Sequence, residues 1–328
     1  MRKVSTYFML LFVAVFTFSS FGKVEITNDN PPTEFELLVQ YLEENGNFIN
    51  TLSPALIQAD EIKENLKNKK YLVLDIRSEA WFEYGHIKNA KNVKGPELLN
   101  YFTNDITPAD YDKITIVCYS GQSASYYASL LRLYGFDNVY SLKWGISSWD
   151  SELAARYWGK NSIDNAEAQL ETTANPIPEK GTCGPKLTTG KTDVKEILKT
   201  RIVEAFAKPY KEFINKTPDV LADPSAFYIV NYVNKDRYDF NHITGAVHYE
   251  PKSLSTDTNL FTLPIDKKIL VACDTGLSAA YVVAYLHVLG YEVGNLAYGA
   301  NSYMNSTMVE KGWNGFSEKE VKDYTLVE

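Results

Sequence analysis

Cysteine and histidine are scarce in this chain, and their placement argues against several classes of protein. The 328 residues include three cysteines and four histidines. So few cysteines, and an odd number of them, argue against a disulfide scaffold. There is no Cys-x-x-Cys pair, which a thiol oxidoreductase would need, and the histidines show no metal-site spacing. We therefore expect no bound metal and no cofactor.

Positive charge is also in short supply. The chain has 33 Lys and Arg residues against 41 Asp and Glu residues, a net charge of −8. An acidic surface is repelled by nucleic acid and by anionic membranes, so we expect neither as a partner. The 45% hydrophobic and 23% charged residues are those of ordinary soluble proteins, and the length allows two domains with separate cores.

The hydrophobic run near the start of the chain is too short to span a membrane comfortably. It covers 12 residues, 7–18, and follows the basic pair Arg2 and Lys3. This pattern is typical of a signal peptide, with cleavage expected after Gly22. We therefore expect residues 1–22 to be removed and the protein to be exported, periplasmic or extracellular, with no stable membrane span afterwards. An uncleaved anchor is the alternative.

Two loops with the same pattern carry two of the three cysteines. Residues 114–124 read ITIVCYSGQSA, and residues 269–279 read ILVACDTGLSA. In both, an apolar run precedes Cys, and a helical pattern follows. This order predicts that Cys118 and Cys273 each lie at the carboxyl end of a buried strand and at the amino end of a helix, where a thiolate is stabilised.

The similarity between the two halves extends beyond the loops. The apolar stretches 71–77 (YLVLDIR) and 227–233 (FYIVNYV) are followed by a Gly-His or Asn-His turn, with the histidine 11 residues after Asp75 or Asn231. Each loop cysteine is also followed, 17 residues later, by a glycine. Matching spacings of this kind indicate an internal duplication of one domain.

The composition along the chain predicts where these domains begin and end. Strands that alternate with helical stretches, with Val- and Ile-rich strand runs, indicate parallel α/β sheets. Helices are expected over residues 34–44, 123–133 (ending at Gly135), 194–206 and 210–214. The expected segments are a polar leader over 23–50, a first domain over 51–158, a linker rich in Pro and Gly over 159–192 and a second domain over 193–328.

Four motifs of the first copy together resemble the tandem two-domain form of the rhodanese family of sulfurtransferases, of the thiosulfate or 3-mercaptopyruvate type. They are Asp-Ile-Arg (75–77), Gly-His-Ile-x-x-Ala (85–90), Cys-x-x-Gly-x-Ser (118–123) and Trp-Gly-x-x-x-Trp (144–149). The resemblance implies an α/β fold with two tandem rhodanese-like domains, each a parallel sheet flanked by helices on both faces. It also implies a cysteine that carries sulfur as a persulfide.

Cys118 is the preferred nucleophile. It would take a sulfane sulfur from a small donor and pass it to a thiol or cyanide acceptor. Loop amides and the helix dipole are expected to lower its pKa. The loop lining would be Tyr119, Ser120, Gly121, Gln122 and Ser123. The alternatives are that Cys118 is a buried, inert thiol and that Ser123 only caps the following helix.

The first loop lacks Arg and Lys. Rhodanese-like enzymes that favour the thiosulfate dianion commonly carry cations there, so the loop resembles those that act on 3-mercaptopyruvate. A cation could also come from elsewhere, such as Arg156 or the facing domain. Asp75 and Arg77 are expected to orient groups near the site. His86 is expected to stabilise a turn, with a general-base role as the alternative.

Cys273 is the second candidate nucleophile. Asn231 and Val233 replace the Asp and Arg of the strand motif, and the neighbouring Asp274 would raise the pKa of the thiol and repel anionic donors. Cys183 would be either a resolving thiol or an incidental exposed cysteine.

Two other classes of function also have a cysteine in such a loop. A cysteine phosphatase needs an arginine six residues after its nucleophile, where Ala124 and Ala279 stand. A catalytically degenerate rhodanese-like module that binds a partner or senses oxidants remains the alternative to sulfur transfer.

Overall fold

A computed structural model describes residues 31–164 and 170–328 of the chain. The expected signal peptide and the start of the leader lie outside the described residues. Within the two described ranges, no helix combines the length and the apolar character needed to cross a membrane. In the same ranges, no three His, Cys, Asp or Glu side chains are grouped as a metal site would require.

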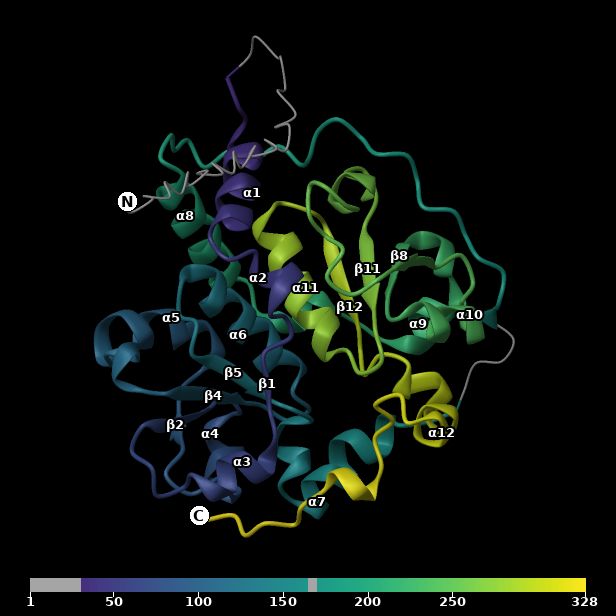
Figure 1. Cartoon of the computed structure of the whole chain (residues 1–328). Coiled ribbons are helices and arrows are strands. Elements are labelled where there is room, and N and C mark those ends of the chain that lie inside the picture. Colours follow the sequence, from purple (N-terminus) through teal and green to yellow (C-terminus); the bar gives the residue numbers. More distant parts are fainter. Residues whose placement is uncertain (1–30, 165–169) are drawn as a thin grey trace, which may run out of the picture. The chain divides into compact units, whose positions relative to one another are not determined.

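Two five-stranded sheets form the framework, and every strand pair within them is parallel (Figure 1). The first has the order β1 (Leu56–Ile57), β5 (Val139–Leu142), β4 (Lys113–Val117), β2 (Tyr71–Asp75), β3 (Lys91–Asn92). The second has the order β7 (Ile214–Asn215), β12 (Val293–Leu296), β11 (Ile269–Ala272), β8 (Tyr228–Tyr232), β10 (Val247–Tyr249). Taken in chain succession, the two orders are the same, as a duplication requires.

Helices flank both sheets. Those of the first half are α1 (Glu34–Glu44), α2 (Phe48–Thr51), α3 (Ala59–Glu64), α4 (Glu79–Tyr84), α5 (Leu98–Asn100), α6 (Gln122–Tyr134) and α7 (Ser151–Ala154). Those of the second half are α8 (Val194–Ala207), α9 (Thr217–Ala222), α10 (Lys235–Phe240), α11 (Leu277–Val288) and α12 (Asn301–Lys311). The expected helix over 210–214 is instead a 3-10 turn, Tyr210–Phe213, that leads into β7. A short antiparallel pair, β6 (Leu170–Glu171) with β9 (His242–Ile243), joins the linker to the second half.

Alternating side chains bury both faces of each sheet. In β2, Leu72 and Leu74 belong to one apolar cluster and Val73 to another. In β11, Ile269 shares the cluster of Leu72, whereas Leu270 lies in a third. Side chains of successive strand residues point to opposite faces, so helices cover both sides of each parallel sheet, as predicted.

The two halves share one large apolar core, and each half also has a separate apolar cluster of its own, as the expected separate cores require. α6 and α11, the helices that follow the two cysteine loops, pack against each other between the sheets (Figure 1). The Ser129 hydroxyl in α6 donates to the Tyr281 carbonyl in α11 at 2.9 Å, and the Tyr281 hydroxyl reaches the Ala55 carbonyl at 2.6 Å. These buried contacts tie the two cysteine loops to a common, densely packed base.

The predicted helix over 34–44 is confirmed and belongs to the packed core. It begins with a capping box, in which the Thr33 hydroxyl accepts from the Glu36 amide at 3.2 Å and the Glu36 carboxylate accepts from the Thr33 amide at 2.7 Å. Phe35 then packs on Phe261 and Tyr291 of the second half, each with ring centroids 6.1 Å apart. The leader therefore helps to hold the second half in place.

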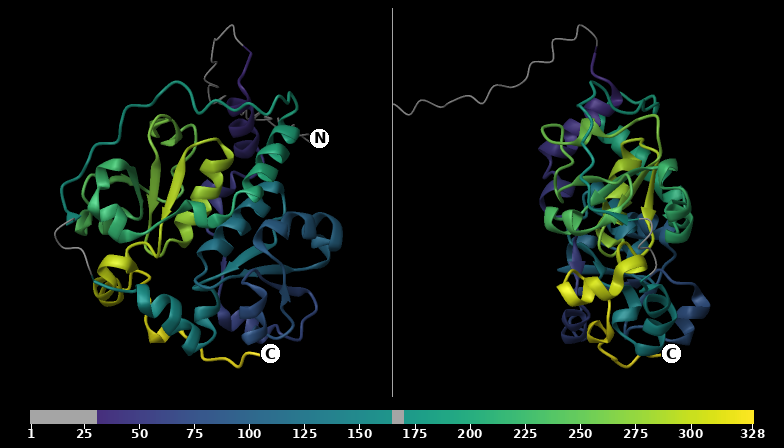
Figure 2. Two further views of the ribbon diagram at one scale, coloured as in Figure 1. Left: turned by 180° about the vertical axis from the view of Figure 1, so that it is seen from behind. Right: turned by 90° about the vertical axis from the view of Figure 1, so that its right-hand side faces the viewer.

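The end of the chain returns to the first half (Figure 2). We call residues 316–328 the C-terminal strap. Its backbone amides at Lys322 and Tyr324 donate to the carbonyls of Ser148 and Trp149 at 2.9 and 2.7 Å. The sequence assigned this segment to the second domain, because a contact between distant segments leaves no local pattern.

Removing residues 318–328 is expected to lower the free energy of unfolding by about 2–4 kcal/mol. The truncation removes two hydrogen-bond acceptors. The Glu320 carboxylate accepts from the indole N–H of Trp144 at 2.7 Å, and the Thr325 carbonyl accepts from the indole N–H of Trp149 at 3.3 Å. Urea denaturation of the two chains measures the difference. Lys319→Ala, at an exposed position of the strap, is the control and should change the value by less than about 0.5 kcal/mol. Equal midpoints for the truncated and complete chains would contradict this prediction.

Candidate active site

Cys118 lies directly after β4 and before α6, as the sequence predicted. Its side chain is buried, and its sulfur accepts hydrogen bonds from the backbone amides of Gly121 at 3.1 Å and Ala124 at 3.4 Å. The Ser123 hydroxyl also bonds to the thiol. The N-cap of α6 is Gly121, in the left-handed region with φ +90°, and no side chain caps the helix there. The interpretation of Ser123 as the helix cap is therefore wrong, and its hydroxyl faces the sulfur.

Cys273 has the same cradle in the second half. Its sulfur accepts from the amides of Gly276 at 3.2 Å and Ala279 at 3.3 Å, and the Thr275 hydroxyl also bonds to it. The N-cap of α11 is Gly276, again in the left-handed region with φ +76°. Both halves therefore hold a sulfur atom inside a ring of amides at the start of a helix.

A glycine from the Trp-Gly or Tyr-Gly segment closes each cradle from below. A Cβ atom on Gly145 would lie 2.5 Å from the carbonyl oxygen of Cys118 and from the amide of Gly121. A Cβ atom on Gly299 would lie 2.1 Å from the carbonyl oxygen of Cys273. No role was predicted from the sequence for the Trp-Gly and Tyr-Gly segments. In the structure, their glycines pack closely against the cysteine loops, which bend around the sulfur atoms.

Burial raises the pKa of the Cys118 and Cys273 thiols above the ordinary value. The surrounding amides and hydroxyls lower both pKa values, but desolvation is the larger effect. The expectation that amides and the helix dipole would lower the pKa of Cys118 is therefore wrong for the free protein. At both positions, burial therefore favours the neutral thiol over the thiolate.

Alkylation of Cys273 should therefore be slow at neutral pH and still be rising above pH ~8.5, the ordinary value for a cysteine. Because the folded pKa is raised, the thiolate fraction at any lower pH is smaller than that of an exposed cysteine. The measurement is the rate of iodoacetamide labelling against pH in a Cys118→Ser, Cys183→Ser chain. The exposed Cys183, alone in a Cys118→Ser, Cys273→Ser chain, is the control. A midpoint for Cys273 below that of Cys183 would contradict the burial argument.

Asp75 and Arg77 form a buried ion pair beneath the first loop. The Arg77 guanidinium donates to the Asp75 carboxylate from Nε at 3.0 Å and from Nη2 at 2.7 Å, and Nη2 also donates to the Gly85 carbonyl at 2.7 Å. The pair therefore joins the strand end to the turn at His86. Nδ1 of His86 lies 3.0 Å from the Phe82 carbonyl oxygen, and the His86 ring stacks on the Phe82 ring. This is the turn-stabilising arrangement expected from the sequence.

Aromatic side chains surround the mouth of the Cys118 loop. Tyr119 lies 4.7 Å from Tyr157 and 6.4 Å from Trp81, measured between ring centroids. The buried indole of Trp158 donates to the Ser120 carbonyl at 3.0 Å. Arg156 pairs with Glu152 and lies over the Trp81 ring at 5.5 Å, so the cation considered from the sequence does lie beside this group.

Gln122 of the first loop faces the second half. Its Oε1 accepts from the Tyr298 amide at 2.9 Å, while its Nε2 donates to the Ser120 hydroxyl at 3.1 Å. Gln122 is buried, and Gly276 of the second loop packs against it. It therefore joins the two cysteine loops and does not line the approach to one sulfur.

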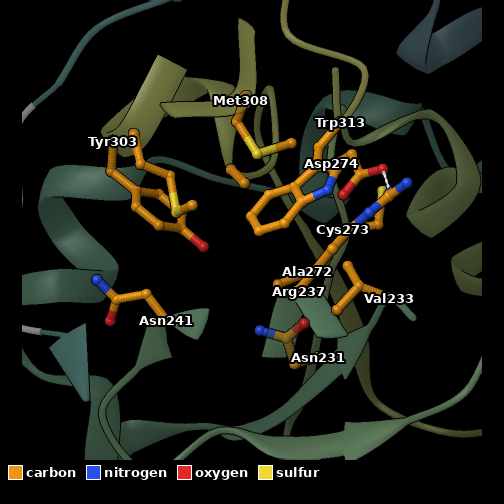
Figure 3. A pocket seen from close by; sticks show the side chains of 12 residues that line it. Asn231, Val233, Arg237, Asn241, Ala272, Cys273, Asp274, Tyr303, Met308 and Trp313 are labelled. Carbon is orange, nitrogen blue, oxygen red and sulfur yellow. Dashed lines mark hydrogen bonds and ion pairs between the residues drawn. The ribbon is translucent and has the colours of Figure 1, made fainter. Parts of the chain in front are cut away.

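Cys273 opens on a cleft of about 270 Å³ between the two halves. A smaller pocket of about 20 Å³, enough for one water molecule, is also lined by this cysteine (Figure 3). Val233, Arg237, Cys273 and Asp274 line both spaces. Figure 3 shows Trp313, Met308 and Tyr303 on the wall that faces Asn231 and Asn241.

The polar groups of this cleft differ from those of the first half. Arg237, in α10, stands where Trp81 stands in α4, and its guanidinium forms an ion pair with Asp274. Asn314 also donates to the Asp274 carboxylate at 2.9 Å. The charge of Asp274 is thus matched, and burial is the largest cause of the raised pKa of Cys273. Sequence reasoning missed Arg237, although aligning the two copies would have placed it beside the second cysteine.

The chain is similar to known proteins of one family. The family described as "Rhodanese-like domain" matches residues 58–152 and 211–306. A thiosulfate sulfurtransferase GlpE of Shewanella oneidensis is 34% identical over 94 residues, which cover 28% of this chain and 89% of that protein. The GlpE of Ectopseudomonas mendocina is 37% identical over 93 residues, covering 28% and 78%. A solved thiosulfate sulfurtransferase from Pseudomonas aeruginosa is similar over 90% of this chain and 48% of its own, with 15% identity and a TM-score of 0.29.

Each half is a parallel α/β domain with a cysteine in an amide cradle, so the chain contains two copies of one type of domain. The chain belongs to the rhodanese-like domain family, with two such domains in tandem.

Proposed function

We propose that this protein is a sulfurtransferase that moves a sulfane sulfur from a small anionic donor to a thiophilic acceptor through a cysteine persulfide. The observation that carries the proposal is Cys273, whose sulfur lies in an amide cradle and borders a cleft large enough for a small molecule. The relatives named thiosulfate sulfurtransferase support it.

The first step forms one S–S bond and breaks another. The Cys273 thiol first loses its proton to solvent. The resulting thiolate attacks the outer sulfur of thiosulfate, and sulfite leaves with the electron pair of the broken S–S bond. With 3-mercaptopyruvate, the C–S bond breaks instead, and the proton of the donor thiol goes to the carbon to give pyruvate. In the second step, cyanide attacks the outer persulfur, thiocyanate leaves and the Cys273 thiolate is restored.

The cradle suits the persulfide better than the free thiol. Amides at 3.2 and 3.3 Å from the sulfur point their N–H groups inward, and α11 directs the positive end of its dipole at the same place. A persulfide is anionic at neutral pH, so it gains more from these donors than the neutral thiol does. The cradle would therefore hold the sulfur between the two half-reactions.

We assign the reaction first to Cys273, whereas the sequence favoured Cys118. The cradles are alike, but the cleft reaches Cys273, while aromatic rings gather at the mouth of the Cys118 loop. Cys118 is the second candidate. From the pattern of residues 1–22 we also propose export to the periplasm or beyond the cell.

The test is thiocyanate formation from cyanide by the purified protein, with thiosulfate and 3-mercaptopyruvate as alternative donors. Turnover with either donor supports the proposal, and the ratio of the two kcat/KM values identifies the preferred class. Absence of turnover with both would overturn it in favour of a rhodanese-like binding or redox-sensing module.

A further inference from the structure

The cleft beside Cys273 has one positive charge that nothing in its lining balances. Its charged side chains are Lys143, Arg237 and Asp274. Arg237 and Asp274 form an ion pair with each other. The remaining charge is the ammonium of Lys143. An uncompensated cation beside a nucleophile attracts anions, even on a protein whose net charge is −8.

Lys143 belongs to the first half, although Cys273, which lines the same cleft, belongs to the second. It follows β5, and its backbone amide donates to the Ile57 carbonyl at 2.9 Å, which fixes its position at the end of the sheet. The partly buried side chain lies with its Nζ 4.9 Å from the centroid of the Trp144 ring and 3.5 Å from Oδ1 of Asn314. The side chain is therefore oriented by neutral groups.

No carboxylate in the described part of the chain pairs with Lys143. By contrast, Arg156 is already paired with Glu152. Asn314, which contacts Lys143, also donates to Asp274, so an amide separates the free cation from the carboxylate of the ion pair. The ammonium is thus left free to bind an anion that enters the cleft.

We infer that Lys143 is a specificity-determining residue of the second domain's site, and that its ammonium binds the negatively charged part of the small sulfur compound that reacts at Cys273. That the anion is the sulfur donor rests on the proposed function. That the anion is drawn to Cys273 rests only on the charge and position of Lys143. The two statements can therefore be tested separately.

The first test uses two alkylating agents that differ in charge. Iodoacetate is an anion and iodoacetamide is neutral, and both react with the Cys273 thiolate in a Cys118→Ser, Cys183→Ser chain. Lys143→Gln is expected to lower the rate with iodoacetate about threefold or more, because it removes a nearby unit charge, and to change the rate with iodoacetamide less than about twofold. Lys143→Arg should keep the parent ratio. Lys94→Gln, which removes a charge from an exposed lysine of the first half, should also keep it.

An unchanged ratio of the two rates in Lys143→Gln would overturn the inference, and so would failure of both reagents to reach Cys273 in the folded protein. Neither result depends on sulfur transfer. In the parent enzyme, Lys143→Gln should raise the KM for thiosulfate severalfold with a smaller change in kcat, since it removes binding and leaves the cradle intact. If the parent enzyme turns over thiosulfate and Lys143→Gln has the same KM, the inference is also overturned. If the parent shows no turnover but Lys143→Gln lowers the ratio of the iodoacetate rate to the iodoacetamide rate, only the proposed function is overturned.

Discussion

Replacing Cys273 with serine is expected to reduce sulfur transfer to cyanide on the order of a thousandfold or more. A hydroxyl of ordinary acidity neither attacks a sulfane sulfur efficiently nor holds it as a persulfide. The readout is the rate of thiocyanate formation with the better of the two donors. The melting temperature of the variant should stay close to that of the parent, because Ser fits the same space and accepts from the same two amides.

Cys118→Ser is the matched control for this variant. In the parent protein, the Cys118 sulfur accepts from equivalent amides and is also buried, so replacing it with a hydroxyl is the same chemical change in both halves. Most of the activity should remain, since the loss falls on the cysteine that does not border the cleft. Activity that disappears only with Cys118→Ser would instead place the reaction in the first half, in agreement with the preference drawn from the sequence.

The fold was predictable because its signals are local and occur twice. A strand, a cysteine, a glycine and a helix in immediate succession leave a pattern that can be recognised in one copy and verified in the other. The helix over 34–44 was equally readable, since Thr33 and Glu36 form the capping box within one turn. The placement of both sulfurs at the strand ends followed from these patterns.

The chemistry of the site was harder to predict because it depends on contacts between distant residues. The pKa of Cys118 is raised, since the surrounding core removes water from the sulfur, and no local pattern reports how complete that burial is. Lys143 reaches the Cys273 cleft from the other domain. Asp274 looked unfavourable in the sequence until Arg237, 37 residues earlier, was seen to pair with it.

The two copies differ in the side chains of the strand motif that lies beside each cysteine. In the first half, Asp75 and Arg77 of the strand motif form an ion pair, and the Arg77 guanidinium also donates to the Gly85 carbonyl. In the second half, Val233 stands in place of the arginine and Asn231 in place of the aspartate, and the guanidinium near the cysteine is that of Arg237, which pairs with Asp274. The better-preserved strand motif thus lies in the half whose cysteine does not line the cleft of about 270 Å³.

Gly299→Ala is expected to destabilise the protein by about 3 kcal/mol or more and to abolish activity. The new Cβ atom would lie 2.1 Å from the carbonyl oxygen of Cys273 and 2.7 Å from the backbone amide of Thr275, so the loop that holds the sulfur must move. The left-handed backbone, with φ +56°, adds strain for any residue with a side chain. Urea denaturation and the thiocyanate assay measure the two effects.

Two other glycines separate the causes of that loss. Gly312 has a similar φ of +69°, but no atom lies within 4 Å of the added Cβ, so Gly312→Ala should cost only about 1 kcal/mol and leave turnover unchanged. Gly145→Ala should destabilise much as Gly299→Ala does, because its Cβ would meet the Cys118 loop at 2.5 Å. If Cys273 is the nucleophile, however, Gly145→Ala should retain more activity than Gly299→Ala when the activity of each variant is expressed per folded molecule. Equal losses in the two variants would mean that the loops work as a unit, joined through Gln122, and would contradict the assignment of catalysis to the second domain alone.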